Sequence, residues 1–152
     1  MNKLFPPDEI KSKISGVMMG ETNEEGIPLR QLYLAALDRN GIKGLRMVRE
    51  PDNPYDPNAI ALHADYGSGD VHIGYIQNRT RICLDCSKEF PRVDSNVEVC
   101  SSCGGTLARE GLASTLAKFI DQGVIFKARV LQFTGGVNSK NRGCNVVIER
   151  LA

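Results

Sequence analysis

The sequence contains no tryptophan, only two histidines and almost no net charge. Its 152 residues carry 19 lysines and arginines against 18 aspartates and glutamates, so the chain lacks the overall basic field of many nucleic-acid-binding proteins. Residues 109–152 hold 7 basic residues against 3 acidic ones, which makes this segment the more favourable one for a polyanion. Its candidate phosphate contacts are Lys127, Arg129, Lys140 and Arg142. A solvated surface would give the same asymmetry.

Long apolar runs are also missing. No stretch approaches the roughly 20 apolar residues that a bilayer-spanning helix requires. The opening stretch, MNKLFPPDEIKSK, has two prolines and several charges where a signal peptide would have an apolar run. We therefore expect a cytoplasmic protein without a membrane partner, whose thiols are reduced or bind metal.

Motifs of the common enzyme classes are absent from the sequence. There is no GxSxG, no HExxH, no P-loop and no paired-glycine dinucleotide fingerprint. His63 and His72 have no cysteine or glutamate at ligand spacing, and we expect both to be isolated, solvent-facing strand residues. The sequence therefore favours a protein that is not an enzyme and has no small-molecule substrate.

Hydrophobic periodicity predicts an α+β protein that is mainly β, with several short strands forming a small barrel and two helices. The first expected helix carries an apolar stripe of Leu29, Leu32, Tyr33, Ala36 and Leu37 and ends near Gly41. The second covers residues 112–120, with a leucine and alanine stripe that we expect in the core. Strands are expected over residues 13–19, 45–49, 59–64, 71–76, 124–133 and 144–150.

Four of the five cysteines form a doubled CxxC pattern. Cys83 and Cys86 are followed, after thirteen residues, by Cys100 and Cys103, which is the spacing of a tetrahedral zinc site with four cysteine ligands. The residues between the pairs are too polar to form a core of their own, so metal binding would supply the folding free energy of this segment. The sequence therefore predicts one structural Zn²⁺ in a small ribbon, because four thiolates leave no coordination position for water.

Other interpretations of the cysteines are a redox dithiol, two local disulfides or unrelated thiols. Cys144 alternates with Val146 and Ile148, and we expect it in the core rather than as a reactive thiol.

One further segment stands out by its turn chemistry. Residues 50–58 contain three prolines and four Asn or Asp residues in nine positions, so they cannot continue a strand and must be held by their own hydrogen bonds. In the simplest interpretation, Asp56 and Asn58 cap backbone amides and Tyr55 packs on the barrel. A rigid turn of this kind is also what a binding pocket needs.

With the cysteine segment set aside, the pattern resembles the HIRAN domain family. The residues that carry the resemblance are VREPDNPYDPNAIAL over 48–62, IGYI over 73–76, LASTLA and IDQG within 112–123, and ISGV over 14–17. The domains expected on this basis are an N-terminal extension over 1–12, a HIRAN-like barrel over 13–80 and 109–152, and an inserted zinc ribbon over 81–108.

The resemblance implies an OB-like or SH3-like β-barrel that captures the 3′-hydroxyl end of single-stranded DNA, in the context of DNA repair. It places Asn53, Tyr55 and Asp56 in the pocket for the terminal nucleotide, Tyr75 against a base or phosphate, and Arg79 as a possible phosphate contact. The aromatic ring would stack on a base, and the carboxylate would accept a hydrogen bond from the terminal hydroxyl.

Two departures from the family pattern affect this expectation. The family's DNA-binding member has an Arg-Tyr pair after the first strand, where this chain has Met18 and Met19, which neither neutralise a phosphate nor stack as firmly. The zinc insertion is foreign to the family pattern. The alternative function is a protein-interaction adaptor, in which the ribbon binds a repair or replication protein and the barrel is a scaffold.

Overall fold

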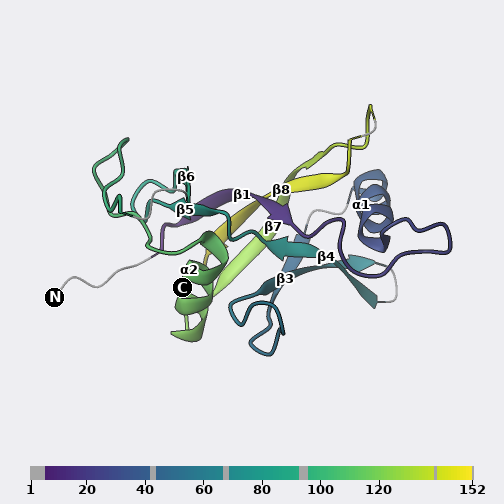
Figure 1. The fold of residues 1–152 in the computed structure, drawn as a ribbon, viewed down its shortest axis with the longest axis horizontal. Coiled ribbons are helices and arrows are strands. Elements are labelled where there is room, and N and C mark those ends of the chain that lie inside the picture. Colours follow the sequence, from purple (N-terminus) through teal and green to yellow (C-terminus); the bar gives the residue numbers. More distant parts are fainter. Residues whose placement is uncertain (1–5, 42–43, 67–68, 93–95, 139, 152) are drawn as a thin grey trace.

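The computed structural model describes residues 6–41, 44–66, 69–92, 96–138 and 140–151. Six antiparallel strands close into a barrel in the order β1-β4-β3-β2-β7-β8, and β8 returns to pair with β1 (Figure 1). The expected fold class, mainly β with a small barrel and two helices, is confirmed. The barrel strands are β1 (Glu9–Ser15), β2 (Gly44–Arg49), β3 (Ile60–Tyr66), β4 (Gly69–Ile76), β7 (Phe126–Thr134) and β8 (Gly143–Arg150).

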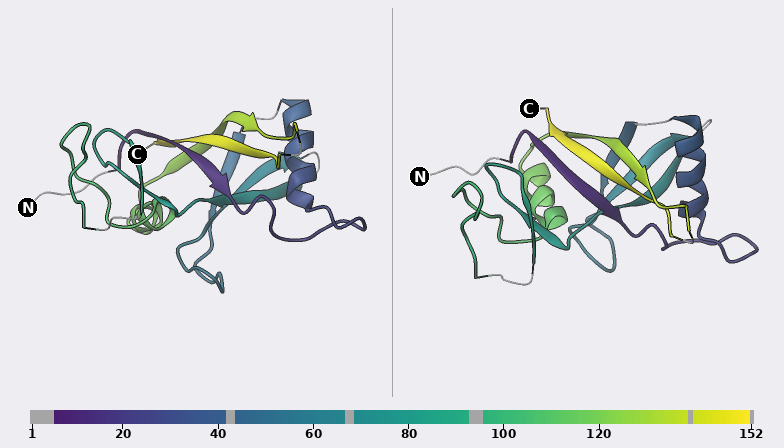
Figure 2. Two further views of the ribbon diagram at one scale, coloured as in Figure 1. Left: turned by 45° about the horizontal axis from the view of Figure 1, so that its top comes forward. Right: turned by 90° about the horizontal axis from the view of Figure 1, so that it is seen from above.

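The two helices lie at opposite ends of the barrel (Figure 2). Helix α1 (Leu29–Asn40) ends at Gly41, whose φ of 74° is the left-handed conformation that glycine adopts most readily. Helix α2 (Leu112–Asp121) lies at the other end, beside the short hairpin of β5 (Thr80–Ile82) and β6 (Glu89–Pro91). The interior between them is filled by buried aliphatic side chains from strands and helices, among them Ile10, Leu37, Leu62, Leu116 and Ile148.

The first strand begins earlier than the sequence indicated. It starts at Glu9 rather than Lys13, and residues 9–13 pair with β8 from Glu149 to Asn145. Exposed and buried positions alternate along this segment, but Ile10 is its only large apolar residue. A single buried isoleucine between charged neighbours gave the pattern too little contrast to be recognised as a strand.

The predicted apolar face of α1 is partly wrong, whereas that of α2 is confirmed. Leu34, Ala36 and Leu37 are the buried residues of α1, but Leu32 is 41% exposed. This helix covers one end of the barrel, so only a narrow part of its surface faces the core. Helix α2 buries its leucine and alanine stripe as expected.

None of the helices in the described ranges is both long enough and apolar enough to cross a membrane.

Two leucines of α1 provide a matched test of this packing. Leu34 is 1% exposed and Leu32 is 41% exposed on the same helix. We expect Leu34→Ala to lower the free energy of unfolding by about 2–5 kcal/mol, because it leaves a cavity in the core. Leu32→Ala should change it by about 0.5 kcal/mol or less. Urea unfolding followed by circular dichroism measures both, and equal losses would contradict the assigned face.

Candidate functional site

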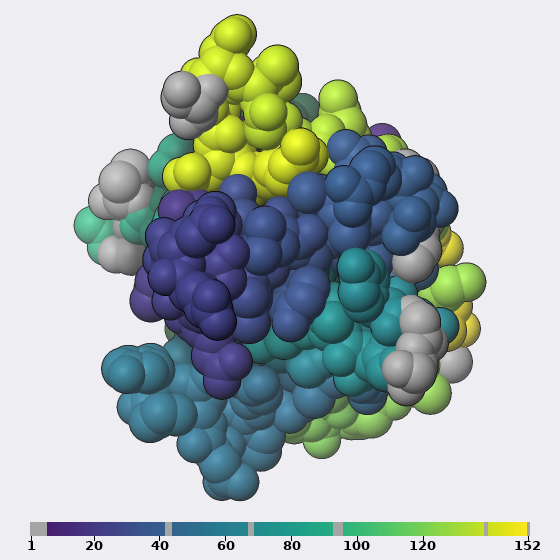
Figure 3. Space-filling view, turned by 90° about the vertical axis from the view of Figure 1, so that its right-hand side faces the viewer, coloured from purple at the N-terminus to yellow at the C-terminus, as the bar shows by residue number. Residues whose placement is uncertain are grey.

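A groove of about 530 Å³ lies between the turn that joins β2 to β3 and the segment that follows β1. In Figure 3 the turn projects beneath the segment 16–28, on the side of the molecule that α1 covers. The floor is formed by the end of β4. The lining residues are Ser15, Met19, Gly20, Arg30, Asn53, Tyr55, Asp56, Ala59, Tyr75, Ile76 and Asn78.

Four of the five DNA-binding candidates lie together in this groove. Asn53, Tyr55 and Asp56 line one wall, and Tyr75 contributes to the floor. Arg79 does not line the groove; it is an exposed residue directly after Asn78, which does. Residues far apart in the sequence are thus brought to one surface, and Arg79 lies just beyond it.

The turn from Glu50 to Ala59 is held by its own polar groups. Asn53 Oδ1 accepts hydrogen bonds from the amides of Tyr55 (2.9 Å) and Asp56 (3.1 Å). Asp56 Oδ1 accepts one from the amide of Asn58 (2.8 Å). The predicted self-bonded turn is therefore confirmed, but the second capping residue is Asn53 rather than Asn58, whose side chain bonds to Ser114. The interpretation in which Tyr55 packs on the barrel is wrong, because this side chain is 95% exposed.

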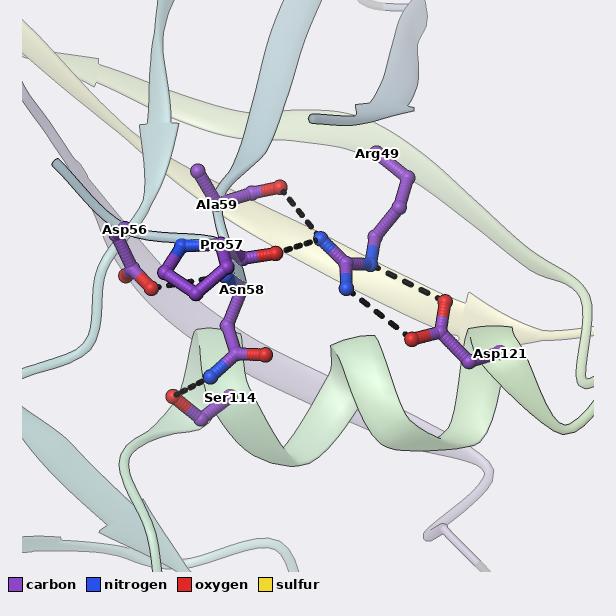
Figure 4. A network of polar contacts seen from close by, with 7 residues as sticks. All are labelled: Arg49, Asp56, Pro57, Asn58, Ala59, Ser114 and Asp121. Carbon is purple, nitrogen blue, oxygen red and sulfur yellow. Dashed lines mark hydrogen bonds and ion pairs between the residues drawn. The ribbon is translucent and has the colours of Figure 1, made fainter. Parts of the chain in front are cut away.

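Two sets of side-chain contacts attach the turn to α2 (Figure 4). Arg49 Nη1 donates to the carbonyl oxygens of Pro57 (2.5 Å) and Ala59 (3.4 Å). The same guanidinium forms a two-pronged ion pair with Asp121, at 3.2 and 3.1 Å. Asn58 Nδ2 donates to Ser114 Oγ at 3.4 Å, on the first turn of the helix. The turn is therefore fixed to both ends of α2.

Glu50 is a polar centre at the base of the turn that the sequence analysis did not identify. Its Oε1 accepts hydrogen bonds from the hydroxyl of Tyr75 (2.9 Å) and from Asn53 Nδ2 (3.0 Å). Burial opposes ionisation of Glu50, but these two hydrogen bonds lower the pKa of its carboxyl group. Burial and the bond to Glu50 raise the pKa of Tyr75. Glu50 therefore holds the Tyr75 ring in place through its hydroxyl group.

Arg30 brings a positive charge into the groove, and the sequence analysis missed it too. Its guanidinium lies 5.4 Å from the centre of the Tyr75 ring, and its Nη1 donates to the carbonyl oxygen of Gly16 at 2.8 Å. Gly16 and Gly20 have φ values of 73° and 88°, and a Cβ at either position would lie within 3.4 Å of the guanidinium. No local pattern on α1 indicates this placement, because the contact joins α1 to a segment fourteen residues away.

The expectation for the two histidines is wrong. His63 and His72 are partly buried and stack on each other, with ring centres 4.9 Å apart. His72 Nδ1 lies 3.0 Å from Arg30 Nη2, and its Nε2 lies 2.8 Å from the carbonyl oxygen of Gly74. Because a guanidinium can only donate, Nδ1 is the acceptor and Nε2 carries the proton. Burial and the charge of Arg30 lower the pKa of His72, so the neutral ring is favoured.

The four cysteines of the doubled CxxC pattern converge and could hold a metal ion. Their sulfur atoms all lie within 4.8 Å of one another; Cys83 and Cys103 are 3.5 Å apart, and Cys86 and Cys100 are 3.7 Å apart. Sulfurs bound tetrahedrally at about 2.3 Å from one ion would lie about 3.8 Å apart. The donor set and its size therefore fit a four-thiolate metal centre.

The two CxxC turns have the same backbone design. The amide of Ser87 donates to the carbonyl of Cys83 (3.0 Å), and the amide of Gly104 donates to that of Cys100 (2.9 Å). Both residues have a positive φ, 69° for Ser87 and 78° for Gly104. Amides also point at sulfur, from Cys86 to Cys83 Sγ (3.4 Å) and from Gly105 to Cys103 Sγ (3.3 Å). Such bonds stabilise the thiolate form that binds metal.

Without metal, the thiols of Cys100 and Cys103 do not ionise together. Burial opposes ionisation of Cys100, but amide hydrogen bonds from Cys103 and Ser102 and the neighbouring thiols lower its pKa to about 7. The amide of Gly105 favours the Cys103 thiolate, yet the neighbouring thiols raise the pKa of Cys103 to about 12. A bound cation would neutralise the repulsion and release the protons.

The cysteine segment is packed against the barrel. Cys83, Cys100 and Leu107 form a small cluster with Phe90, whereas Ile82 and Leu84 belong to the main core. The fifth cysteine, Cys144, is buried in that core as expected, and burial raises its pKa to about 12.

The remaining candidates for phosphate contact lie outside the groove lining. Arg129 pairs with Glu149 at 3.1 Å and Arg142 with Asp38 at 3.8 Å, and Lys127 and Lys140 are exposed. Met18 is 44% exposed and Met19 65%, and Met19 lines the groove. The positive charge in the groove therefore comes from Arg30 rather than from this basic group.

The lowered pKa of Glu50 makes stability depend on pH. A carboxyl group whose folded-state pKa lies below the usual 4.5 stabilises the fold above pH 4.5, and this contribution is lost as pH falls through the folded-state value. We expect Glu50→Gln to lower the free energy of unfolding at neutral pH and to flatten its decline in acid. Urea unfolding at several pH values measures this. The exposed Glu24→Gln should keep the wild-type profile, and a wild-type profile for Glu50→Gln would contradict the assignment.

Metal content tests the cysteine cluster. We expect purified protein to contain about one metal ion per chain, and Cys100→Ser to contain almost none, because a hydroxyl is a poor substitute for a thiolate ligand. Cys144→Ala, which removes the cysteine outside the cluster, should keep the metal. Elemental analysis measures both, and loss of metal from Cys144→Ala alone would contradict the site.

Comparisons with protein-family models, with curated proteins and with solved structures give no match for this chain. Among the described residues, two features could bind a ligand or a metal ion. One is an open groove with an exposed tyrosine beside a carboxylate, and the other is a cluster of four converging thiols.

Proposed function

We propose that this chain is a HIRAN-like module that binds the 3′-hydroxyl end of single-stranded DNA in the groove, without catalysing a reaction. The observation that carries the proposal is the exposed ring of Tyr55 beside the half-buried carboxylate of Asp56, both on the wall of one groove. Apolar stacking and a polar acceptor for a hydroxyl are the two contacts that a terminal nucleotide requires.

Tyr55 supplies the stacking surface. Its ring is 95% exposed, while its amide is fixed by the Asn53 side chain at 2.9 Å. The backbone beneath the ring is therefore ordered before any ligand arrives, so little conformational entropy is lost on binding. A base stacked on such a ring contributes about 1–3 kcal/mol whatever its identity.

Asp56 supplies selectivity for the end of the strand. Its Oδ1 accepts the Asn58 amide, and its other oxygen remains available to accept a hydrogen bond from a 3′-hydroxyl. A 3′-phosphate at the same place would meet the negative charges of Asp56 and of the nearby ionised Glu50. The groove therefore favours a free hydroxyl over a phosphorylated end.

Arg30 takes the place of the basic residue that is missing at Met18 and Met19. One of its N–H groups is used by Gly16 and another by His72, and a guanidinium has five. Arg30 lines the groove, and in this proposal its remaining donors bind the phosphate nearest the terminus. In this proposal the neutral His72 ring keeps Arg30 over Tyr75.

The metal of the cysteine cluster is proposed to be Zn²⁺ with a structural role. Four cysteine thiolates in two CxxC turns are the common ligand set of structural zinc. All four positions are taken by protein, so the ion supplies folding free energy to the ribbon rather than an activated water.

Binding of labelled oligonucleotides tests the proposal by fluorescence anisotropy. We expect a single strand with a free 3′-hydroxyl to bind more tightly than its 3′-phosphorylated or duplex form. Tyr55→Ala should weaken binding by about 5- to 150-fold, the equivalent of about 1–3 kcal/mol for one stacked base. Asp56→Asn should bind the two kinds of 3′ end with more similar affinities, since it removes the repelling charge.

Two substitutions serve as controls. Asp52→Asn removes a carboxylate from the same turn outside the groove lining, and Tyr66→Ala removes a tyrosine that contacts Tyr33 instead. Both should keep the wild-type preference. Equal binding of hydroxyl and phosphate ends by the wild-type protein would refute end recognition. Binding only to a protein partner, unchanged at high salt, would favour the adaptor function.

A further inference from the structure

We propose that Arg92 of the metal-binding ribbon joins Arg79, which lies just before the ribbon, in a phosphate-binding extension of the groove. The inference rests on the proposed function, since it concerns the path of a strand whose end lies in the groove. It assigns the ribbon a direct part in binding, with the phosphodiester backbone of the same single strand as its ligand.

The two arginines lie opposite each other at the open end of the β5–β6 hairpin. Thr80 pairs with Pro91 in this antiparallel ladder, and the next backbone contact joins the amide of Arg92 to the carbonyl oxygen of Arg79 at 3.3 Å. Both side chains are exposed. The hairpin therefore presents two exposed arginines from opposite positions of its two strands.

Arg92 is connected directly to the groove. Its Nη1 donates to the carbonyl oxygen of Asn78 at 2.8 Å, and Asn78 lines the groove. Asn78 is itself held by α2, because its side chain exchanges two hydrogen bonds with Ser114, each of 3.0 Å. A strand that leaves the groove past Asn78 would therefore meet the Arg79 and Arg92 guanidinium groups next.

The charge pattern distinguishes this pair from most of the other arginines. Arg46, Arg49, Arg109, Arg129, Arg142 and Arg150 each have a carboxylate partner. Within the part of the chain that the structure describes, neither Arg79 nor Arg92 forms an ion pair. The nearby carboxylate of Glu89 accepts hydrogen bonds from Thr80 and Gln77 instead.

Two like charges directly opposite each other on a hairpin destabilise it unless an anion lies between them. A phosphate relieves this repulsion and matches the flat guanidinium fork. Bases offer no comparable compensation for the charge. We therefore assign phosphate, rather than base, as the group that the pair binds.

The experiment compares strand length and salt dependence. Wild-type protein and Arg79→Gln/Arg92→Gln are titrated with strands of about 4 and about 12 nucleotides that carry a free 3′-hydroxyl. We expect the wild type to bind the longer strand more tightly and the variant to lose about tenfold in affinity for it. The slope of log affinity against log salt should fall in magnitude by about 0.7, the value for one phosphate of a single strand.

Two further variants make the result specific. Arg39→Gln/Lys140→Gln removes the same charge from exposed positions on α1 and on the β7–β8 loop, and it should bind as the wild type does. Arg79→Lys/Arg92→Lys keeps the charge and should restore most of the salt slope. Equal metal content and equal unfolding curves establish that the variants are folded.

The outcomes separate the two proposals. The extension is refuted if Arg79→Gln/Arg92→Gln binds the longer strand as tightly as the wild type does. It is also refuted if Arg39→Gln/Lys140→Gln loses as much affinity for that strand. In either case, a retained preference for 3′-hydroxyl ends leaves the groove proposal intact. If the wild type shows no end preference but Arg79→Gln/Arg92→Gln still lowers the salt slope, end recognition fails and the phosphate site stands.

Discussion

The turn between β2 and β3 is the constraint on which the groove depends. A segment with three prolines cannot pair as a strand, so its amides and carbonyls need partners inside the turn or on neighbouring elements. Asn53 and Asp56 satisfy amides from within, and Arg49 satisfies two carbonyl oxygens from outside while pairing with Asp121. Because the backbone is determined by so many bonds, Tyr55 can remain exposed without leaving the wall of the groove disordered.

The floor of the groove depends on a second network, centred on Tyr75. Glu50 accepts the Tyr75 hydroxyl proton in a hydrogen bond, Arg30 lies over the ring, and His72 contacts the ring edge while accepting from Arg30. Glu50 directly follows β2, Arg30 lies on α1 and His72 lies on β4. The negative Glu50, the positive Arg30 and the neutral His72 ring are thus fixed around the Tyr75 ring, and each limits the positions that the others can take. Asn78 then connects this floor to α2 and to the ribbon.

Much of the architecture was accessible from the sequence because it follows from local patterns. The CxxC spacing, the proline-rich turn and the alternation of β7 and β8 each reflect residues close together in the chain. The start of β1 was missed because Ile10 is the single large apolar residue of its first half. The face of α1 was misjudged at Leu32 because the barrel end, rather than the helix pattern, determines how much of the helix is covered.

The sequence by itself determined the fold class, the converging thiols and the self-bonded turn, since in each case the physical cause is a short-range one: periodicity, ligand spacing or turn chemistry. Only the tertiary structure decided that Arg30 lines the groove, that Glu50 bonds to Tyr75 on its floor, and that His63 and His72 stack together. It also decided that Tyr55 is exposed rather than packed. Barrel closure brings together side chains from separate elements, and such contacts between residues far apart in the sequence cannot be predicted from local patterns.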